Sequence, residues 1–423
     1  MRYCCAIFFL LWATSTIEGA ELIVTANLSS ALAQASAGDT ITVVGPGTFS
    51  AHLKITNSIR LRGTNSPIID GDGIGTPITI AASDVEVSGV VIRNSGTDLG
   101  AFDSAVMILS NNVTVAQCRI ENDAFGIYVR GANDCRIERN DIIGSAQCPS
   151  AKRGNGIHLW KTHGNEIVGN KIHDKRDGMY FSYADTNLIT DNEVSETRFG
   201  IHYMYSHANR LLRNSLTANA VGATLMFSRD SVVSDNVVVG NRRHGILFKQ
   251  VDRSRISGNF ISGHNRGFFI QQATQNRFEA NTVATNDIGV YMSNCSEQNI
   301  FVGNNFIGNT DQIWQPTDEV EAGRMASNKF FEKGCGNFWS DYSGLDQNRD
   351  GIGDTPYHET DVLGFIIERH PDARAFAMSP AAALLRKGEE LMPILDSPGV
   401  TDSYPLMAPN RLPVPQPAKI AAK

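Results

Sequence analysis

One feature constrains the fold of this chain more than any other: a repeat of about 22 residues runs through its middle. Each unit begins with a glycine that precedes a short apolar run, and these glycines are Gly126, Gly156, Gly178, Gly200, Gly222, Gly245, Gly267 and Gly289. Their spacings are 30, 22, 22, 22, 23, 22 and 22 residues, and the long first interval fits an insertion at 144–153. A fixed period of this length is typical of a solenoid.

Asparagine recurs at two fixed places in each unit. Fourteen residues after most of the glycines stand Asn140, Asn170, Asn192, Asn214, Asn236, Asn259 and Asn281. Nine residues after the same glycines stand Cys135, Asn165, Asn187, Asn209, Ser231, Ser254 and Asn276. Gly and Asn tolerate the left-handed backbone of tight turns, so each unit reads as three short strands separated by turns. We expect the asparagines to form hydrogen-bonded ladders, with Cys135 as a small buried filler.

Three short strands in 22 residues predict one rung of a parallel β-helix, in which rungs stack about 4.8 Å apart. We therefore predict an all-β protein, a right-handed parallel β-helix of about 11–12 rungs between Thr40 and Trp339. A short helix near residue 30 would cap its N-terminal end. The predicted segments are a signal peptide (1–20), the β-helix with its cap (21–340), a C-terminal extension with an Asp/Gly turn and an amphipathic helix (341–410), and a disordered tail (411–423).

The N-terminus has the pattern of a secretory signal. Arg2 precedes an apolar run, Tyr3–Thr14, and small residues follow up to Ala20. A retained interfacial anchor is the alternative. The pattern predicts export to the periplasm, and five cysteines remain after cleavage, too few for a disulfide scaffold. The formal net charge of −7 gives no basic excess to neutralise phosphates, which disfavours nucleic acid as a partner.

The first strand of each unit predicts an unusual outer face. Alternation turns the first and third residues after each glycine inward and the second and fourth outward. The outward positions hold aromatic, Met and His side chains, whereas an ordinary solvent-exposed sheet face would hold mostly charged ones. His158 and His202 occupy equivalent outward positions two rungs apart, and Met204 and Met226 lie one rung apart in the next column. Thioethers beside imidazoles suit Cu(I), so these four residues are the candidate copper ligands; packing beneath a loop or partner is the alternative.

A second candidate metal site lies in the C-terminal extension. Asp346, Asn348, Asp350 and Asp354 have the spacing of oxygen ligands in a calcium loop. Tyr357 stands where an EF-hand has its bidentate Glu, so we expect either bound Ca²⁺ without an EF-hand or a structural Asp/Gly turn.

Three further histidines and three aspartates are also considered as functional residues. His207, His244 and His264 fall in predicted turns and are expected to be solvated. Parallel β-helices often carry polysaccharide chemistry on paired carboxylates, for which Asp174, Asp177 and Asp185 are the nearest candidates. The outward face has no repeated carboxylate, which disfavours a glycosidase or lyase.

Several segments together resemble a known family. Gly156–Trp160, Phe199–Ser206, Gly222–Ser228, Asn337–Tyr342 and Asp402–Leu406 are similar to segments of the nitrous oxide reductase maturation proteins, NosD. The resemblance extends over essentially the whole mature chain. The 22-residue repeat alone is shared with many carbohydrate-active proteins, whereas the segment His202–Ser206 and the tail segments are much more specific.

The resemblance implies a periplasmic accessory protein that is not an enzyme. Such a protein docks on an ABC transporter permease and ATPase complex. It handles copper or sulfur for the copper–sulfur centre of nitrous oxide reductase, and it works with a copper chaperone. The resemblance assigns no copper ligands, so His158, His202, Met204 and Met226 rest on the soft-donor argument alone. The alternative class is a secreted polysaccharide lyase or epimerase.

Overall fold

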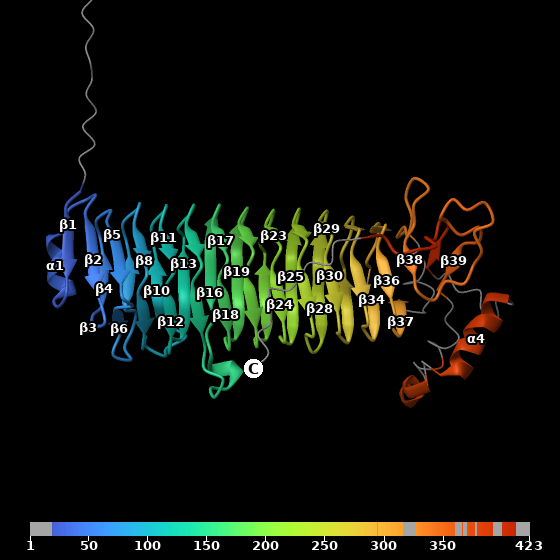
Figure 1. The fold of residues 1–423 in the computed structure, drawn as a ribbon, viewed down its shortest axis with the longest axis horizontal. Coiled ribbons are helices and arrows are strands. Elements are labelled where there is room, and N and C mark those ends of the chain that lie inside the picture. The colour runs from blue at the N-terminus through green and yellow to red at the C-terminus, as the bar shows by residue number, and fades with distance from the viewer. Residues whose placement is uncertain are drawn as a thin grey trace, which may run out of the picture.

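The structure is a computed structural model that describes residues 19–293, 295–315, 327–359, 366, 370–376, 379–391 and 400–411. The predicted signal peptide falls almost wholly at 1–18 and the predicted tail almost wholly at 412–423, so both lie outside the described residues. The described chain forms a long solenoid with α1 (Leu28–Gln34) at one end and α4 (Pro380–Leu391) near the other (Figure 1).

Three parallel sheets of 13, 12 and 13 strands run along the solenoid. The first sheet consists of β1 (Glu21–Val24), β2 (Thr40–Val44), β5 (Arg60–Thr64), β8 (Glu86–Ser88), β11 (Thr114–Ala116), β14 (Arg136–Glu138), β17 (Glu166–Val168), β20 (Leu188–Thr190), β23 (Arg210–Leu212), β26 (Val232–Ser234), β29 (Arg255–Ser257), β32 (Arg277–Glu279) and β35 (Ile300–Val302).

The second sheet has the longest strands. It consists of β4 (Leu53–Ile55), β7 (Ile78–Ile80), β10 (Ser104–Ile108), β13 (Phe125–Arg130), β16 (Ile157–His163), β19 (Asp177–Asp185), β22 (Phe199–Met204), β25 (Val221–Arg229), β28 (His244–Asp252), β31 (Arg266–Gln271), β34 (Ile288–Ser293) and β37 (Asp311–Trp314).

The third sheet completes each rung. It consists of β3 (Thr48–Ser50), β6 (Ile68–Asp70), β9 (Val91–Arg93), β12 (Arg119–Glu121), β15 (Asp141–Ile143), β18 (Lys171–His173), β21 (Glu193–Ser195), β24 (Ser215–Thr217), β27 (Val237–Val239), β30 (Phe260–Ser262), β33 (Thr282–Ala284), β36 (Asn305–Ile307) and β38 (Phe338–Trp339).

This architecture confirms the predicted parallel β-helix. Each strand pairs in parallel with its counterpart one unit away, as Ile157 does with Met179, so the 22-residue period is the register of the sheets. There are about 13 rungs, slightly more than predicted, because β1 adds a strand ahead of Thr40. The loop 144–153, with its short 3-10 helix Ser150–Lys152, lies in the long first interval of the repeat, where the insertion was predicted.

The core lies inside the solenoid, between the three sheets. The predicted inward residues of the second sheet are all buried: Ile157, Leu159, Met179, Phe181, Ile201, Tyr203, Ala223, Leu225, Ile246, Phe248, Phe268, Ile270, Val290 and Met292. Facing residues of the first and third sheets, such as Ile167 and Ile172, are equally buried. Burial of these stacked apolar columns is the main favourable contribution to folding.

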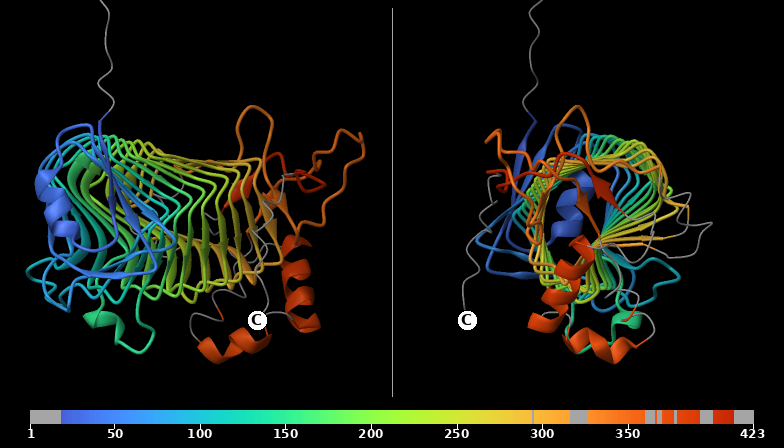
Figure 2. Two further views of the ribbon diagram at one scale, coloured as in Figure 1. Left: turned by 60° about the vertical axis from the view of Figure 1, so that its left-hand side comes forward. Right: turned by 90° about the vertical axis from the view of Figure 1, so that its right-hand side faces the viewer.

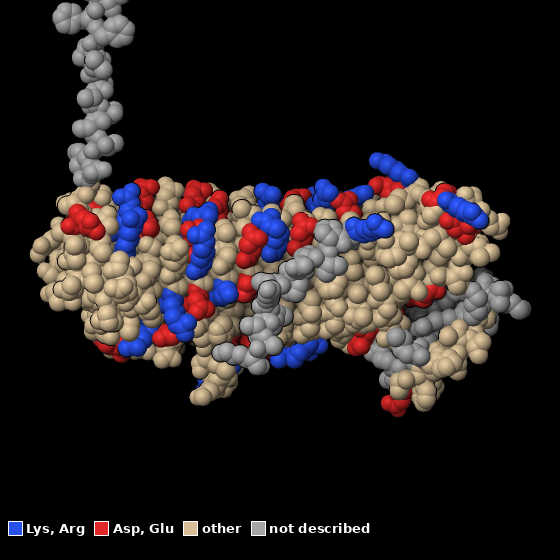
Figure 3. Space-filling view, in the orientation of Figure 1, with Lys and Arg blue, Asp and Glu red and all other residues tan. Residues whose placement is uncertain are grey.

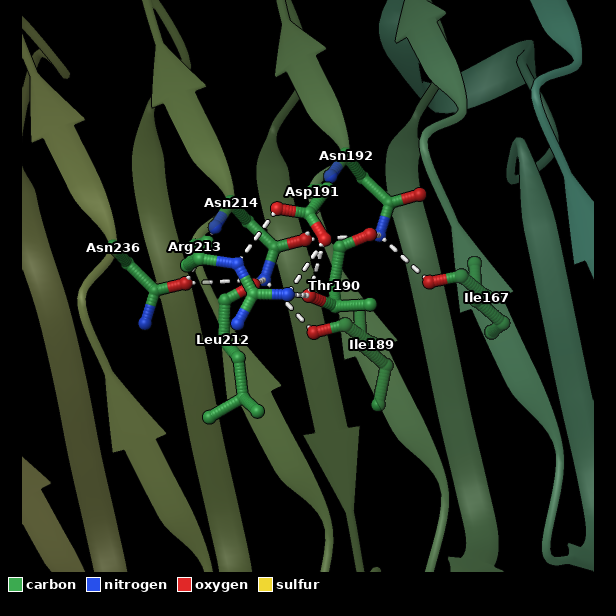
Figure 4. A network of polar contacts seen from close by, with 9 residues as sticks. All are labelled: Ile167, Ile189, Thr190, Asp191, Asn192, Leu212, Arg213, Asn214 and Asn236. Atoms are coloured by element: carbon green, nitrogen blue, oxygen red, sulfur yellow. Dashed lines mark hydrogen bonds and ion pairs between the residues drawn. The ribbon is translucent and has the colours of Figure 1, made fainter. Parts of the chain in front are cut away.

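The two predicted asparagine ladders are present. At Asn192 the backbone N–H donates to Asn214 Oδ1 at 3.0 Å, and its amide Nδ2 donates to Ile167 O at 2.9 Å and to Asn214 Oδ1 at 2.9 Å (Figure 4). Cys135 is the predicted buried filler, and its N–H donates to Asn165 Oδ1 at 3.0 Å. Each ladder satisfies backbone groups that the turns would leave unpaired inside the solenoid.

A third ladder was not predicted. It consists of Thr197, Asn219, Asn241, His264, Asn286 and Asn309. The expectation that His264 is solvated was wrong, because its ring is buried in this ladder. Its Nδ1 accepts from Asn241 N at 3.0 Å and its Nε2 lies 3.0 Å from Val238 O, so the imidazole takes the place of an asparagine amide.

The two ends of the solenoid are closed differently. At the N-terminal end α1 covers the core, with Leu28 buried and Asn27 accepting from Ser30 N at the helix start (Figure 2). At the C-terminal end Trp339 stacks on Phe306 at 4.5 Å and on Tyr357 at 4.3 Å between ring centroids. Tyr357 begins β39 (Tyr357–His358), which pairs with β40 (Thr401–Asp402).

The C-terminal extension contains the predicted amphipathic helix. A 3-10 helix (Pro371–Phe376) precedes α4, which begins at Pro380, and Ser379 Oγ accepts a hydrogen bond from Ala382 N. Leu384 and Leu385 of α4 are exposed. In the part of the chain that the structure describes, no helix combines the length and apolar character needed to cross a membrane.

Candidate functional site

The outer face of the second sheet carries a column of rings that contact one another in tilted and edge-to-face arrangements. In consecutive strands the register aligns Tyr128, His158, Tyr180, His202 and Thr224. Ring centroids lie 4.5 Å apart for Tyr128 and His158, and 4.9 Å apart at each of the next two steps. The two predicted histidines therefore lie two rungs apart as expected, but the Tyr180 ring separates them.

The two methionines form a direct pair beside this column. Met204 on β22 is aligned with Met226 on β25, and both side chains are half-buried. Met204 follows His202 by two residues on the same strand, so the two side chains leave the same face. The structure thus brings His202, Met204 and Met226 together, whereas His158 belongs to the neighbouring part of the column.

His202 has one paired and one unpaired nitrogen. Its Nδ1 lies 3.1 Å from Asp177 Oδ2, and Arg198 holds the same carboxylate with Nε at 2.8 Å and Nη2 at 2.7 Å. Burial would raise the pKa of Asp177, but the hydrogen bonds from His202 and Arg198 outweigh it and lower the pKa. His202 Nε2 and Thr224 Oγ1 are buried and have no hydrogen-bond partner among the described residues.

An unpaired buried nitrogen on the same sheet face as two aligned thioethers fits a soft metal ion. A neutral imidazole nitrogen with a free lone pair is a metal donor, and Met sulfur prefers Cu(I). An orphaned buried polar atom otherwise costs free energy, about 1–3 kcal/mol, with nothing gained in return. The donor set of His202, Met204 and Met226 therefore has the chemistry that copper requires.

His158 has a different environment. It is buried, and its Nδ1 lies 3.4 Å from the Asn155 amide. Burial lowers its pKa to about 4, so its imidazole is neutral at neutral pH. It lines a hollow of about 280 Å³ together with Phe102, Tyr128, Arg130, Trp160, Tyr180 and Ser182. The candidate copper ligands Met204 and Met226 are not among its lining residues.

Sequence analysis missed an exposed aromatic stack beside the methionines. Tyr183, Tyr205 and Phe227 stack with centroids 5.3 and 4.7 Å apart and planes within 14° of parallel. All three have left-handed backbones, with φ of 52°, 51° and 52°. Tyr183 is 53% and Tyr205 40% exposed. The signal was available in the sequence, because an aromatic residue stands five positions after each of three successive repeat glycines.

The predicted calcium loop is arranged as a hydrogen-bonded turn. Asp346 accepts from the N–H groups of Asp350 and Gly351, and Asp354 accepts from that of Gln347. Within the described ranges, no three His, Cys, Asp or Glu side chains are grouped so that they could hold a metal ion. The arrangement favours the structural-turn alternative for this loop, including Asn348, and calcium binding there stays a prediction.

Many of the remaining charged groups on the surface form ion pairs, several of them across rungs. Figure 3 shows Lys and Arg side chains next to Asp and Glu along the solenoid, and Arg213 with Asp191 is one such pair, at 2.8 Å. The carboxylates considered for polysaccharide chemistry are engaged as well. Asp174 contacts His173, Asp177 binds Arg198, and Asp185 accepts from His207 N.

By its fold the chain is a parallel β-helix of the repeat-built solenoid class. Among solved structures it is similar to the Dettilon tailspike protein (gp208), with a TM-score of 0.56, 15% identity, and coverage of 71% of this chain and 66% of that one. It is also similar to the A-module of the mannuronan C-5 epimerase AlgE6 of Azotobacter vinelandii, with a TM-score of 0.50, 13% identity, and coverage of 72% and 92%. At these identities the likeness shows the fold alone.

Sequence relatives define the family. The family described as "Periplasmic copper-binding protein (NosD)" matches residues 140–344, and a "Protein of unknown function (DUF1565)" family matches residues 17–222. The "Probable ABC transporter binding protein NosD" of Stutzerimonas stutzeri is 32% identical over 378 residues, which cover 85% of each chain. The protein of the same name from Pseudomonas aeruginosa is 31% identical over 396 residues, 90% of each. The chain belongs to the NosD family.

Proposed function

We propose that this protein is an exported accessory factor that carries Cu(I) on the outer face of its second sheet during maturation of nitrous oxide reductase. The observation that carries the proposal is the unpaired, buried Nε2 of His202 on the sheet face that also bears the aligned Met204 and Met226. The family description as periplasmic and copper-binding supports it. A sulfur species for the same copper–sulfur centre is the alternative cargo.

Copper is cargo here, so the site must release it as well as bind it. Two thioethers and one imidazole form a neutral donor set, which favours Cu(I) over harder divalent ions. Met204 and Met226 are half-buried and not enclosed, so a partner can approach the metal from outside. A copper chaperone would load this face, and nitrous oxide reductase would unload it.

The docking partner would be the permease of an ABC transporter, together with its ATPase. The names of the two relatives describe them as probable ABC transporter binding proteins, which supports this assignment. The C-terminal end of the core is already closed by Trp339 and Tyr357, so α4 is not needed as a cap. Its exposed Leu384 and Leu385 offer an apolar surface to a partner. The residues predicted to follow it, Ile394 and Leu395, lie outside the described ranges.

This function is not enzymatic. The alternative of a polysaccharide lyase or epimerase is supported only by the shared fold, because the carboxylates of Asp174, Asp177 and Asp185 already bind neighbouring groups. In the proposed role the protein works in the periplasm, next to the membrane through its transporter partner.

The test is copper loading of the purified protein. Metal-free protein is incubated with Cu(I) under anaerobic, reducing conditions, and retained copper is quantified after desalting into a chromophoric Cu(I) chelator of known affinity. We expect retention by the wild type and strong loss in H202A. Equal copper retention by the wild type and H202A would contradict this site. If the wild type retained no copper, the proposal that the protein binds Cu(I) without a partner would be contradicted.

A further inference from the structure

Asp177 is not one of the proposed copper ligands, but it contacts one of them, His202. It begins β19, one rung before His202, and its Oδ2 lies 3.1 Å from His202 Nδ1. Its side chain is only 2% exposed, and Arg198 forms two hydrogen bonds with its two oxygens. The hydrogen bonds from Arg198 thus hold the carboxylate against the imidazole.

The ring of His202 is also held on its other sides. Tyr180 packs against it at 4.9 Å with a plane angle of 67°, and Phe199 packs at 4.8 Å with a plane angle of 70°. Phe199 is itself covered by the Arg198 guanidinium at 4.5 Å. Arg198 thus orients both the carboxylate and one ring that packs against His202.

The carboxylate decides which nitrogen of His202 carries the proton. An ionised carboxylate only accepts hydrogen bonds, so the hydrogen bond between His202 and Asp177 requires a proton on Nδ1. Nε2 then presents its lone pair, and it is the nitrogen left without a partner in the described structure. Carboxylates commonly bind the second nitrogen of metal-ligating histidines in this way.

This arrangement occurs at one place in the repeat. The positions equivalent to Asp177 in adjacent rungs are Asn155, Phe199 and Val221, none of which is a carboxylate. His158, the other histidine of the column, has only the Asn155 amide at 3.4 Å. The acidic side chain is thus placed where it serves His202 alone.

We infer that Asp177, held by Arg198, is a positioning residue that fixes His202 in its Nδ1–H tautomer and directs Nε2 toward the copper ion. The inference rests on the proposed function and deepens it, because it separates the ligands from the group that orients one of them. It also predicts that His202 and not His158 is the essential imidazole.

The experiment compares D177N with D191N. Asp191 forms the same paired contact with an arginine, Arg213, at 2.9 and 2.8 Å, and no histidine of the described chain hydrogen-bonds to it. We expect the Cu(I) affinity of D177N to fall about 10–100-fold and that of D191N to stay at the wild-type value. Affinity is measured by competition with a chromophoric Cu(I) chelator.

A tautomer measurement separates positioning from a structural role. In metal-free protein with ¹⁵N-labelled histidine, the wild type should show His202 protonated at Nδ1, and D177N should show a mixed or reversed tautomer. A dominant Nε2–H tautomer in the wild type would overturn the inference, and this result needs no variant to fold.

The outcomes distinguish the two levels of the proposal. If H202A and M204L/M226L lose copper while D177N keeps wild-type affinity, the copper site stands and the role of Asp177 is refuted. If all these variants bind copper as the wild type does, the proposed site itself fails. Loss in D177N alone, with the His202 tautomer unchanged, would assign Asp177 a structural role and overturn the inference.

Discussion

The ammonium group of Lys175 lies 2.5 Å from Oδ2 of Asp123, two rungs away, and both side chains are almost completely removed from solvent. Lys175 stands at the repeat position that Thr197 and Asn219 occupy in the third ladder. The loop 144–153 interrupts the regular turns between these rungs. The long lysine side chain therefore bridges a gap that an asparagine amide could not reach, which makes this ion pair the local substitute for the ladder.

The first prediction concerns this pair. K175M leaves the Asp123 carboxylate buried without its cation, and breaking a buried pair in this way costs about 3–5 kcal/mol. Amide hydrogen exchange in β12, β15 and β18 should accelerate, and thermal unfolding should begin at lower temperature. The double variant D123N/K175M removes the stranded charge and should recover part of the loss. A double variant as unstable as K175M would contradict the ion-pair interpretation.

The second prediction concerns the ladders. Replacing Asn192 or Asn214 with Leu removes an amide that satisfies buried backbone groups on two sides. Each unsatisfied buried group costs about 1–3 kcal/mol, so both variants should melt at clearly lower temperature. N265L is the control, because its side chain loses only an exposed hydrogen bond to Asp287. Unchanged melting of N192L and N214L would refute the structural role of the ladder.

Features that repeat one residue type at a fixed spacing are predictable from the sequence, whereas features that mix residue types or occur once are not. The Gly and Asn positions repeat, so rungs, inward columns and two ladders follow from spacing alone. His264 breaks the pattern by residue type, although its two nitrogens replace the acceptor and donor of an amide. The contact of Asp177 with His202, 25 residues later, depends on side-chain directions that strand alternation does not specify.

The same distinction applies to the candidate site. Register alone placed Met204 beside Met226, and the structure confirms that alignment. The separation of His158 from His202 by a tyrosine ring also follows from register, because Tyr180 occupies the intervening outward position. That Nε2 of His202 has no hydrogen-bond partner cannot be predicted from register, because it depends on the positions of all the neighbouring donors and acceptors.

The third prediction tests the methionines. M204L/M226L removes both sulfur donors and keeps volume and apolarity, so folding should survive, since such swaps usually cost under about 1.5 kcal/mol. Cu(I) retention should fall strongly, measured by metal analysis after desalting. The matched control is M179L/M292L, which changes two fully buried methionines of the inward columns. Full copper loading of M204L/M226L would leave these residues with a packing role only.

The fourth prediction tests the docking helix. Deletion of 366–397 should leave a folded, exported β-helix that no longer co-purifies with the co-expressed ABC permease and ATPase. L384D/L385D should have the same effect, because it places charge on exposed apolar positions of α4. L345D is the control, since Leu345 is another exposed leucine of the C-terminal extension. An aggregated deletion variant would identify the segment as a cap of the core.

The fifth prediction concerns pH. Burial lowers the pKa of His264, and burial with nearby Arg266 and Arg243 lowers that of His244 to about 4. Because these folded-state pKa values lie below the unfolded value of about 6.5, the unfolded chain binds more protons between the two values. The stabilisation is therefore fully present above about pH 6.5 and is lost as pH falls through the folded-state pKa, by at most about 1.4 kcal/mol per pH unit for each histidine.

The substitution H264N isolates one of these contributions. Asparagine is the residue at the neighbouring ladder positions Asn241 and Asn286, and its amide can accept from Asn241 N and donate to Val238 O as the imidazole does. H264N should therefore fold and bind copper as the wild type does, but lose less stability between pH 7 and pH 5, measured by denaturant unfolding at each pH. H52N, which replaces an exposed histidine, should keep the wild-type pH dependence. If H264N and wild type lose the same stability on acidification, the buried neutral imidazole at this position is not the source of the acid sensitivity.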